Sequence, residues 1–354
     1  MLKFYQGTNI MSYYDGTKLL SLQDIDGKKP ELYLCTTNRT AGKTTYFARL
    51  LINRYKKSGS KFALLYRYNY EIDDIPDKFF KDIHVLFFPN DELSSKSRAR
   101  GIYHELFLND EPCGYAISLN SAEQIKRYSH LFSDVDSMFF DEFQSETNHY
   151  CNDEIQKFQS VHDSIARGRG KQSRYVPCYL CGNPITILNP YYIALGISER
   201  LSASTKFMRG PGWVMEQGFN ESAAAALAES GFHRAFSNER YSAYSEQGVY
   251  LNDNSAFIEK PDGASRYLAT LKYKGKFYAI REYSEAGVLY CDNRPDQTYS
   301  NRITVTTDDH EINFVMLQTN SLFIAQLRNY FNHGCFRFKD LACKEAILKT
   351  ISYY

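Results

Sequence analysis

The chain lacks an excess of charge of either sign, and it lacks a long apolar segment. Its 354 residues carry 42 Lys and Arg against 41 Asp and Glu, a formal net charge of +1. This balance excludes a histone-like protein, so any contact with nucleic acid must come from a local patch. No run of about 18 apolar residues occurs, so we expect no transmembrane helix. The first residues, MLKFYQG, contain no apolar core of a secretory signal, and we expect a cytoplasmic protein.

The sequence also lacks the paired motifs of a zinc site. Eight cysteines are present, and in a cytoplasmic chain we expect them to be free thiols. Cys178 and Cys181 form one C-x-x-C, but no second C-x-x-C or H-x-H follows at the spacing of a zinc finger. The pair lies in the apolar run 176–181 (VPCYLC), which favours a buried strand over a metal site.

Short apolar runs alternate with helical patterns through residue 195, which indicates a layered α/β sheet. A hairpin is expected within 101–119, around the turn residues 109–112 (NDEP). Helices are expected at 44–57 and from 152 or 153 to 167. The other expected strands lie at 31–36, 61–68, 82–88, 137–140 and 174–181.

The composition changes at residue 198, where Gly, Ser and Ala become frequent. One short helix, at 222–229, is indicated before residue 250. Farther along, strands are expected at 266–273, 276–282, 287–291 and 302–306, followed by a helix at 308–320. We therefore predict three parts: an α/β domain at 1–197, a linker or bridging subdomain at 198–250, and a smaller α+β domain at 251–354.

The loop between the first strand and the first long helix carries a phosphate-binding pattern. Residues 37–44 (TNRTAGKT) match G-x-x-x-x-G-K-[ST], except that Thr37 replaces the first glycine. Backbone N–H groups at a helix N-terminus attract anions. Lys43 is then expected to contact the β- and γ-phosphates, and the Thr44 hydroxyl to bind Mg²⁺. An incidental GKT in a surface loop is the alternative. The predicted nucleotide-binding residues are Asn38, Arg39, Thr40, Ala41, Gly42, Lys43, Thr44 and Thr45.

The apolar strand at 137–140 ends in two acids, Asp141 and Glu142. An ATPase of this type needs an acid at the carboxyl end of a neighbouring strand to hold Mg²⁺, and an adjacent glutamate can activate the attacking water. We predict the metal role for Asp141 and the general-base role for Glu142. Two acids that merely end a strand are the alternative, but their occurrence together with the GKT loop favours an ATP site.

Asn183 and one arginine complete the predicted catalytic set. Asn183 follows the strand at 174–181 and is a candidate sensor of the γ-phosphate, with a simple Asn-Pro turn as the alternative. Arg167 is the first candidate, ahead of Arg169, for an arginine finger that reaches the γ-phosphate of a neighbouring subunit. Charges that complement a helix dipole are the alternative. The role of Arg39 stays open between catalysis and pairing with a carboxylate.

Together these motifs resemble the DNA-packaging ATPases of φ29-like tailed bacteriophages. The similar segments are the GKT loop with Arg39, the MFFDEF strand, the CGNP turn and the Asn-Pro-Tyr that follows it. The segments 256–260 (AFIEK), 273–275 (YKG) and 306–309 (TTDD) extend the resemblance over roughly residues 20–345. These C-terminal segments are more specific than the ATPase motifs, which many ATPases share.

The resemblance implies an ATP- and Mg²⁺-dependent motor that translocates double-stranded DNA into an empty procapsid. It implies a homomeric ring, with a pentamer as the expected size, docked on the portal (connector) protein in the host cytoplasm. An RNA or protein adaptor is a further candidate partner, and no membrane is involved. In such rings the catalytic arginine acts in trans, which suits Arg167. Lys126 and Arg127 match the DNA-contacting basic site, with a solvated helix face as the alternative.

The fold that follows is an ASCE-type, RecA- or terminase-like P-loop NTPase sheet between helices, then a linker and an RNase H-like domain. A nuclease of that type needs several carboxylates for two metals. The strand at 266–273 (RYLATLKY) carries no acid, and Asp308 and Asp309 suffice as helix caps. We therefore expect a vestigial nuclease domain used for docking. An active terminase, a non-hydrolysing assembly protein and a small-molecule kinase are the alternatives.

Overall fold

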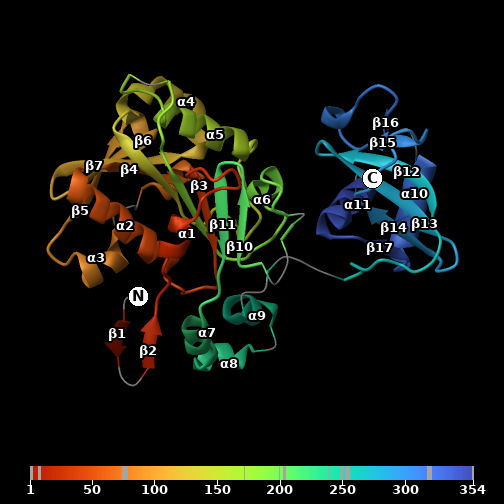
Figure 1. Ribbon diagram of the computed structural model, residues 1–354, viewed down its shortest axis with the longest axis horizontal. Coiled ribbons are helices and arrows are strands. Elements are labelled where there is room, and N and C mark those ends of the chain that lie inside the picture. Colours follow the sequence, from red (N-terminus) through yellow and green to blue (C-terminus); the bar gives the residue numbers. More distant parts are fainter. Residues whose placement is uncertain are drawn as a thin grey trace. The chain divides into compact units, whose positions relative to one another are not determined.

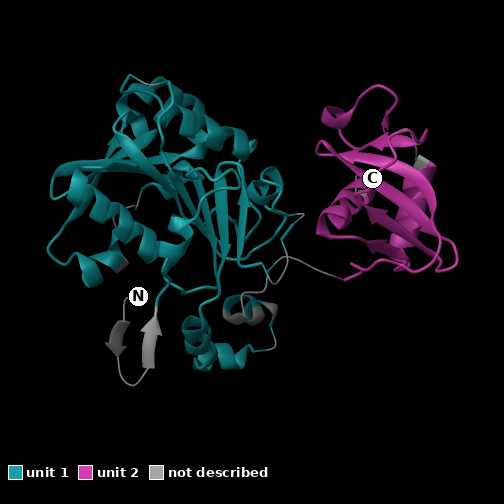
Figure 2. Cartoon of the chain, in the orientation of Figure 1, with its two compact units in different colours: residues 1–252 teal, residues 253–354 magenta. Residues whose placement is uncertain are grey.

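The computed structural model describes residues 3–6, 9–73, 79–170, 172–198, 200–201, 205–237, 239–247, 250–251, 256–316 and 321–352. They form two compact units, residues 1–252 and 253–354 (Figure 2). Each unit has its own sheet and its own apolar core. Among the described residues, no helix is both long enough and apolar enough to span a bilayer.

The first unit is built on a mixed sheet whose described strands follow the order β10-β11-β3-β9-β8-β4-β7-β6-β5 (Figure 1). The strands from β11 to β7 run parallel to one another, and β10, β6 and β5 add antiparallel edges. A separate ribbon, β1 (Lys3–Gln6) and β2 (Asn9–Ser12), precedes the sheet. The parallel strands are β3 (Leu32–Thr36), β4 (Lys61–Tyr66), β7 (Glu111–Ser118), β8 (Val135–Phe140), β9 (Cys178–Gly182) and β11 (Trp213–Gln217), and the edge strands are β5 (Leu93–Arg98), β6 (Tyr103–Leu108) and β10 (Phe207–Gly210).

Helices cover both faces of this sheet, as predicted for an α/β layer fold. Alternate residues of β8 show the two faces: Phe139 belongs to one core cluster, and Met138 and Phe140 belong to the other. Because both faces are buried, the central strands are apolar almost throughout. The face of Phe139 packs against α1 (Thr17–Ser21), α2 (Lys43–Ser58) and α3 (Lys81–Phe87). The opposite face packs against α4 (Ala122–Arg127), α5 (Glu154–Ile165) and α6 (Pro190–Ala194).

The strand predicted at 82–88 is wrong, because this segment forms the helix α3. Short apolar runs do not distinguish a strand from a helix. The strand beside β4 is instead β7, which forms a hairpin with β6 around residues 109–112 as predicted. The expected buried strand at the C-x-x-C pair is present as β9, and both cysteines are buried thiols.

The segment 198–250, expected to be a linker or bridging subdomain, instead contributes two strands to the main sheet. β10 and β11 form a hairpin, and β11 pairs in parallel with β3. This pairing covers an edge of β3 that would otherwise carry unpaired backbone groups. The strands are short and flank the glycine-rich residues 210–212, which hid them in the sequence. Three helices follow: α7 (Glu221–Ala228), α8 (Gly231–Ala235) and α9 (Arg240–Gln247).

The second unit is α+β, with strands in the order β16-β15-β12-β13-β14-β17. β12, β13 and β14 form an antiparallel meander, β15 and β16 add in parallel beside β12, and β17 adds in parallel beside β14. Two helices, α10 and α11, share its core cluster. The elements are β12 (Arg266–Tyr273), β13 (Lys276–Tyr283), β14 (Val288–Asp292), β15 (Arg302–Thr304), β16 (Val315–Met316), α10 (Ser321–Asn332), β17 (Phe336–Phe338) and α11 (Leu341–Ser352).

The helix predicted at 308–320 is wrong in its described part, which holds a single 3-10 turn (Thr307–Asp309) and β16. Residues 317–320 lie outside the described residues. Asp309, expected as a helix cap, is buried and accepts hydrogen bonds from the backbone N–H groups of Lys274 and Gly275 and from the Thr306 hydroxyl. Its carboxylate therefore anchors the β12–β13 turn and does not start a helix.

Candidate nucleotide site

Three polar segments meet at the carboxyl edge of the parallel sheet. The phosphate-binding-type loop follows β3, Asp141 follows β8, and Asn183 follows β9. β9 lies between the other two strands and is parallel to both. Since neighbouring parallel strands end at the same edge, their last residues and the loops after them come together there. The sheet topology alone thus assembles residues that are far apart in sequence.

The loop has the backbone that its glycine requires. Gly42 precedes α2 with φ +91°, in the left-handed region that favours glycine. A Cβ at this position would lie 2.9 Å from Cδ1 of Tyr13. Thr37, which replaces the first glycine of the motif, does not have a positive φ. The Thr37 hydroxyl accepts a hydrogen bond from the ammonium group of Lys43 at 3.0 Å.

Lys43 is buried among neutral oxygen atoms. Only 7% of the residue is exposed. Its ammonium group donates to the carbonyl of Thr37 (3.2 Å), to the carbonyl of Asn38 (3.3 Å) and to Oδ1 of Asn183 (3.0 Å). Burial lowers the pKa of Lys43, because the charged form loses hydration. The contact with Asn183 brings the predicted sensor residue to the predicted phosphate-binding lysine.

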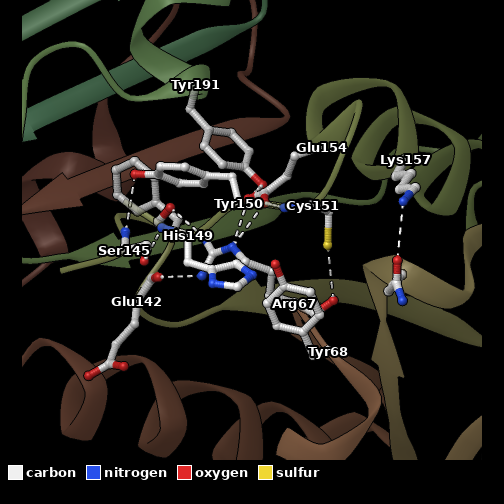
Figure 3. A network of polar contacts seen from close by, with 12 residues as sticks. Arg67, Tyr68, Glu142, Ser145, His149, Tyr150, Cys151, Glu154, Lys157 and Tyr191 are labelled. Carbon is white, nitrogen blue, oxygen red and sulfur yellow. Dashed lines mark hydrogen bonds and ion pairs between the residues drawn. The ribbon is translucent and has the colours of Figure 1, made fainter. Parts of the chain in front are cut away.

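The two acids differ in environment. Burial raises the pKa of Asp141 to about 6, and a hydrogen bond from Thr44 opposes that rise. Glu142 is exposed and has φ +54°, and its carboxylate extends away from the neighbouring polar network (Figure 3). Thr44, Asp141 and Glu142 line one cavity of about 320 Å³. The predicted metal-binding pair and the predicted base therefore share one cavity.

Arg67 braces the acidic turn, and the sequence analysis missed it. The residue follows β4, the neighbour of β8, and its guanidinium donates to the carbonyl of Phe143 at 2.8 Å. It also forms a buried ion pair with Glu154 of α5, at 2.9 Å (Figure 3). Glu154 accepts further hydrogen bonds from the Tyr191 hydroxyl (2.9 Å) and the backbone N–H of Cys151 (2.8 Å). The sequence did carry one signal for this role, because Arg67 is a charged residue directly after the apolar strand β4.

Gln144 ties the acidic segment to the other two strands. Its side chain is buried, and Oε1 accepts from the backbone N–H groups of Ile185 (3.1 Å) and Thr186 (3.2 Å). Nε2 donates to the hydroxyl of Thr36 at 3.4 Å. This residue was also missed, because nothing in the local sequence indicates which loops its amide joins.

Asn38 and Arg39 connect the loop to the helices α7–α9. The Asn38 side chain exchanges two hydrogen bonds with the backbone of Asn220, the N-cap residue of α7, at 2.8 and 3.1 Å. Arg39 forms an ion pair with Glu146 at 2.5 Å and donates to the hydroxyl of Tyr241 in α9. Of the two roles left open for Arg39, the structure shows the pairing with a carboxylate.

The predicted arginine-finger residues and the predicted DNA-contacting residues lie elsewhere. Arg169 forms an ion pair with Asp136 at 3.0 Å. Asp136 lies near the amino end of β8, about 16 Å along the strand from Asp141. Arg167 is exposed in the same segment. Lys126 and Arg127 are exposed in the last turn of α4. None of these four residues lines the cavity of Thr44, Asp141 and Glu142 in its own chain.

Comparison with known proteins agrees with this geometry. The family model of the podovirus DNA encapsidation protein (Gp16) matches residues 9–352. The chain belongs to this family. Among its relatives, the DNA packaging protein of Bacillus phage phi29 is 24% identical over 345 residues, which are 96% of each chain. That of Bacillus phage B103 is 24% identical over 319 residues, 89% of this chain and 93% of the relative.

The fold of this encapsidation-family chain is also known from solved structures. A chain of the bacteriophage Phi-29 viral genome packaging motor assembly has a TM-score of 0.68 at 22% identity, with 96% of this chain and 97% of that chain covered. The Phi-28 gp11 DNA packaging motor has a TM-score of 0.56 at 16% identity, with 97% and 98% covered. The likeness thus extends through both units.

The buried pair of Arg67 and Glu154 generates a stability prediction. Glu154→Gln leaves the guanidinium buried without its counter-charge, so we expect a loss of about 3–5 kcal/mol in the unfolding free energy of the first unit. Glu105→Gln, which breaks the more exposed pair with Arg98, should cost less than about 1 kcal/mol. Chemical denaturation followed by circular dichroism measures both. Equal losses in the two variants would contradict the bracing role.

Proposed function

We propose that this chain is the ATPase of a motor that drives double-stranded DNA into an empty procapsid. Family membership supports the packaging role. The single observation that carries the ATPase role is the cavity shared by Thr44, Asp141 and Glu142, next to the buried Lys43. A cation held by neutral oxygens, a hydroxyl–carboxylate pair and a free carboxylate are the groups that phosphoryl transfer to water needs.

Each residue then has a distinct role. Lys43 exchanges its neutral partners for the β- and γ-phosphate oxygens of ATP. Thr44 and Asp141 are the residues that would hold Mg²⁺, which neutralises charge on the phosphates when bound. Glu142 accepts a proton from the attacking water. Asn183 shares a hydrogen bond with Lys43, so a change at the γ-phosphate alters the partners of its amide, as a sensor requires.

The motor is proposed to be a homomeric ring, expected as a pentamer, on the portal protein of the procapsid in the host cytoplasm. The position of Arg167 and Arg169 supports action in trans. They lie by the amino end of β8, whereas Asp141 follows its carboxyl end, so neither serves its own site in this conformation. Lys126 and Arg127 are proposed to contact DNA, and an RNA or protein adaptor is a further proposed partner.

The second unit is proposed to be a vestigial RNase H-like domain used for docking. The strand order β14-β13-β12-β15-β16 supports this proposal. The first three strands form an antiparallel meander and the last two add in parallel beside β12, an arrangement typical of RNase H-like folds. β12 carries no acid, and Asp309 is occupied in bracing a turn.

Two substitutions test the ATPase role. Lys43→Ala should abolish turnover, because it removes the charge that binds the phosphates. Glu142→Gln should keep ATP binding but slow turnover by about 10²–10⁴-fold, since an amide cannot accept the proton. Phosphate release and nucleotide binding by the purified protein measure the two effects. Lys57→Ala, at an exposed position of α2, the helix that carries Lys43, is the control. Turnover of Glu142→Gln within a few-fold of wild type would refute the assignment of Glu142 as the general base.

A mixing experiment tests the arginine finger. Arg167→Ala should bind ATP and hydrolyse it poorly, yet it keeps an intact Lys43, Asp141 and Glu142. Mixed with Lys43→Ala subunits, it creates interfaces where an intact loop faces an intact arginine, so ATPase activity should recover. No recovery at any ratio, once subunit exchange is shown independently, counts against a trans role. Recovery with Arg169→Ala but not with Arg167→Ala moves the role to Arg169.

The DNA contact is tested by salt dependence. Lys126→Ala combined with Arg127→Ala should weaken DNA binding, and each lost phosphate contact should lower the slope of log affinity against log salt by roughly 0.9. Fluorescence anisotropy with duplex DNA at several salt concentrations gives the slope. The pair Lys57→Ala and Lys81→Ala, both at exposed positions, is the control. An unchanged slope in the variant of Lys126 and Arg127 would mean that these residues form a solvated helix face and do not contact DNA.

A further inference from the structure

The loop between α5 and β9, which carries both candidate finger arginines, is closed at its base. The backbone N–H of Arg174 donates to the carbonyl of Ala166 at 2.8 Å, which joins the two ends of the loop. The Arg174 side chain is buried, and its guanidinium donates to the carbonyls of Ile165 (2.8 Å) and Val135 (3.0 Å). The two ends of the loop therefore have fixed positions against α5 and β8.

Three consecutive residues of this loop have a left-handed backbone. The φ angles of Gly168, Arg169 and Gly170 are +107°, +52° and +75°. A Cβ on Gly168 would lie 2.8 Å from Cβ of Ser133, so the glycine allows the loop to pass close to the segment before β8. A positive φ is uncommon at an arginine, and such a residue keeps this conformation where its surroundings hold it. For Arg169 the surroundings include the ion pair with Asp136.

The carboxylate of Asp136 contacts two guanidinium groups. Its Oδ1 lies 3.0 Å from Nη1 of Arg169 and 3.5 Å from Nη1 of Arg174. Burial and the positive charge of Arg169 lower the pKa of Arg174, and the charge of Asp136 opposes both. Without this carboxylate the two cations would repel each other, because like charges at short range disfavour their charged forms. Asp136 thus connects Arg169 to Arg174, which two backbone carbonyls already hold in place.

The two candidate arginines of the loop differ in their contacts. Arg169 is engaged in the ion pair with Asp136, whereas Arg167 is exposed and lies between the closed base of the loop and its left-handed turn. We propose that Asp136 and Arg169 are positioning residues, whose ion pair holds the loop so that Arg167 is presented to the neighbouring subunit. This inference rests on the proposed trans finger, and it gives the two arginines separate roles.

The ion pair should matter more for the position of the loop than for folding. The side chains of Arg169 and Asp136 are 50% and 35% exposed, and ion pairs at such positions contribute little to stability. An arginine finger contributes about 10³–10⁵-fold to the rate, and a displacement of about 1 Å can cost about 10²-fold. We therefore expect loss of the pair to lower finger-dependent turnover by roughly 10- to 100-fold, without unfolding the subunit.

Mixed rings of the full-length protein test the inference, because they place Asp136→Asn on one chosen side of an interface. The reference mixture combines Arg167→Ala subunits, which keep the ATP site, with Lys43→Ala subunits, which keep the finger. Asp136→Asn added to the Lys43→Ala subunits should lower phosphate release by roughly 10- to 100-fold. The same change added to the Arg167→Ala subunits should leave the reference rate, because their loop has already lost its finger. Asp163→Asn on the finger-donating subunits, at an exposed position of α5, is the matched control and should change nothing.

Two further variants of the finger-donating subunit test the ion pair itself. Arg169→Gln combined with Asp136→Asn should lose no more activity than the larger single loss, because each substitution breaks the same contact. Asp136→Glu keeps the charge and should retain most of the activity. Equal losses in both mixtures would mean that Asp136 only supports the fold, and additive losses or no loss would also overturn the inference. A reference mixture without activity, once subunit exchange is shown, would refute the trans finger itself.

Discussion

A buried ammonium group without a charged partner in direct contact is the constraint around which the first unit is arranged. Among the residues that the structure describes, Lys43 donates to neutral oxygens of the loop and to Oδ1 of Asn183. Removing a cation from water is costly unless it is paired, so this position favours an anionic ligand. The parallel order of β3, β9 and β8 supplies the geometry, because it places the loop after β3, Asn183 and Asp141 at one edge of the sheet.

Side-chain hydrogen bonds join the segments around this cation to one another. Gln144 joins the acidic segment to the last residue of β3 and to the loop after β9, and Arg67 holds the turn after Asp141. Asn38 and Arg39 connect the loop after β3 to α7 and α9. A motor needs such a connection, since hydrolysis produces work only if the site and a mobile element have coupled states.

The sequence predicted the segments whose chemistry is local. The GKT loop, the DE pair and the Asn183 turn each end an apolar strand, so the parallel sheet brings them together as expected. The sequence did not predict α3, because the residues at 82–88 are apolar enough for a strand or a helix. Nor did it show that β11 completes the sheet beside β3, or that Arg67 and Gln144 brace the site, because these roles depend on partners distant in sequence.

The most direct test of the account is the ATPase rate of the purified full-length protein with and without double-stranded DNA and procapsids. A motor whose hydrolysis is coupled to translocation should turn over slowly alone and markedly faster when DNA and procapsids are both present. The stimulation should disappear in Lys43→Ala. A rate that is the same under all conditions, or no ATP turnover in any of them, would contradict the proposal that this chain is a packaging motor.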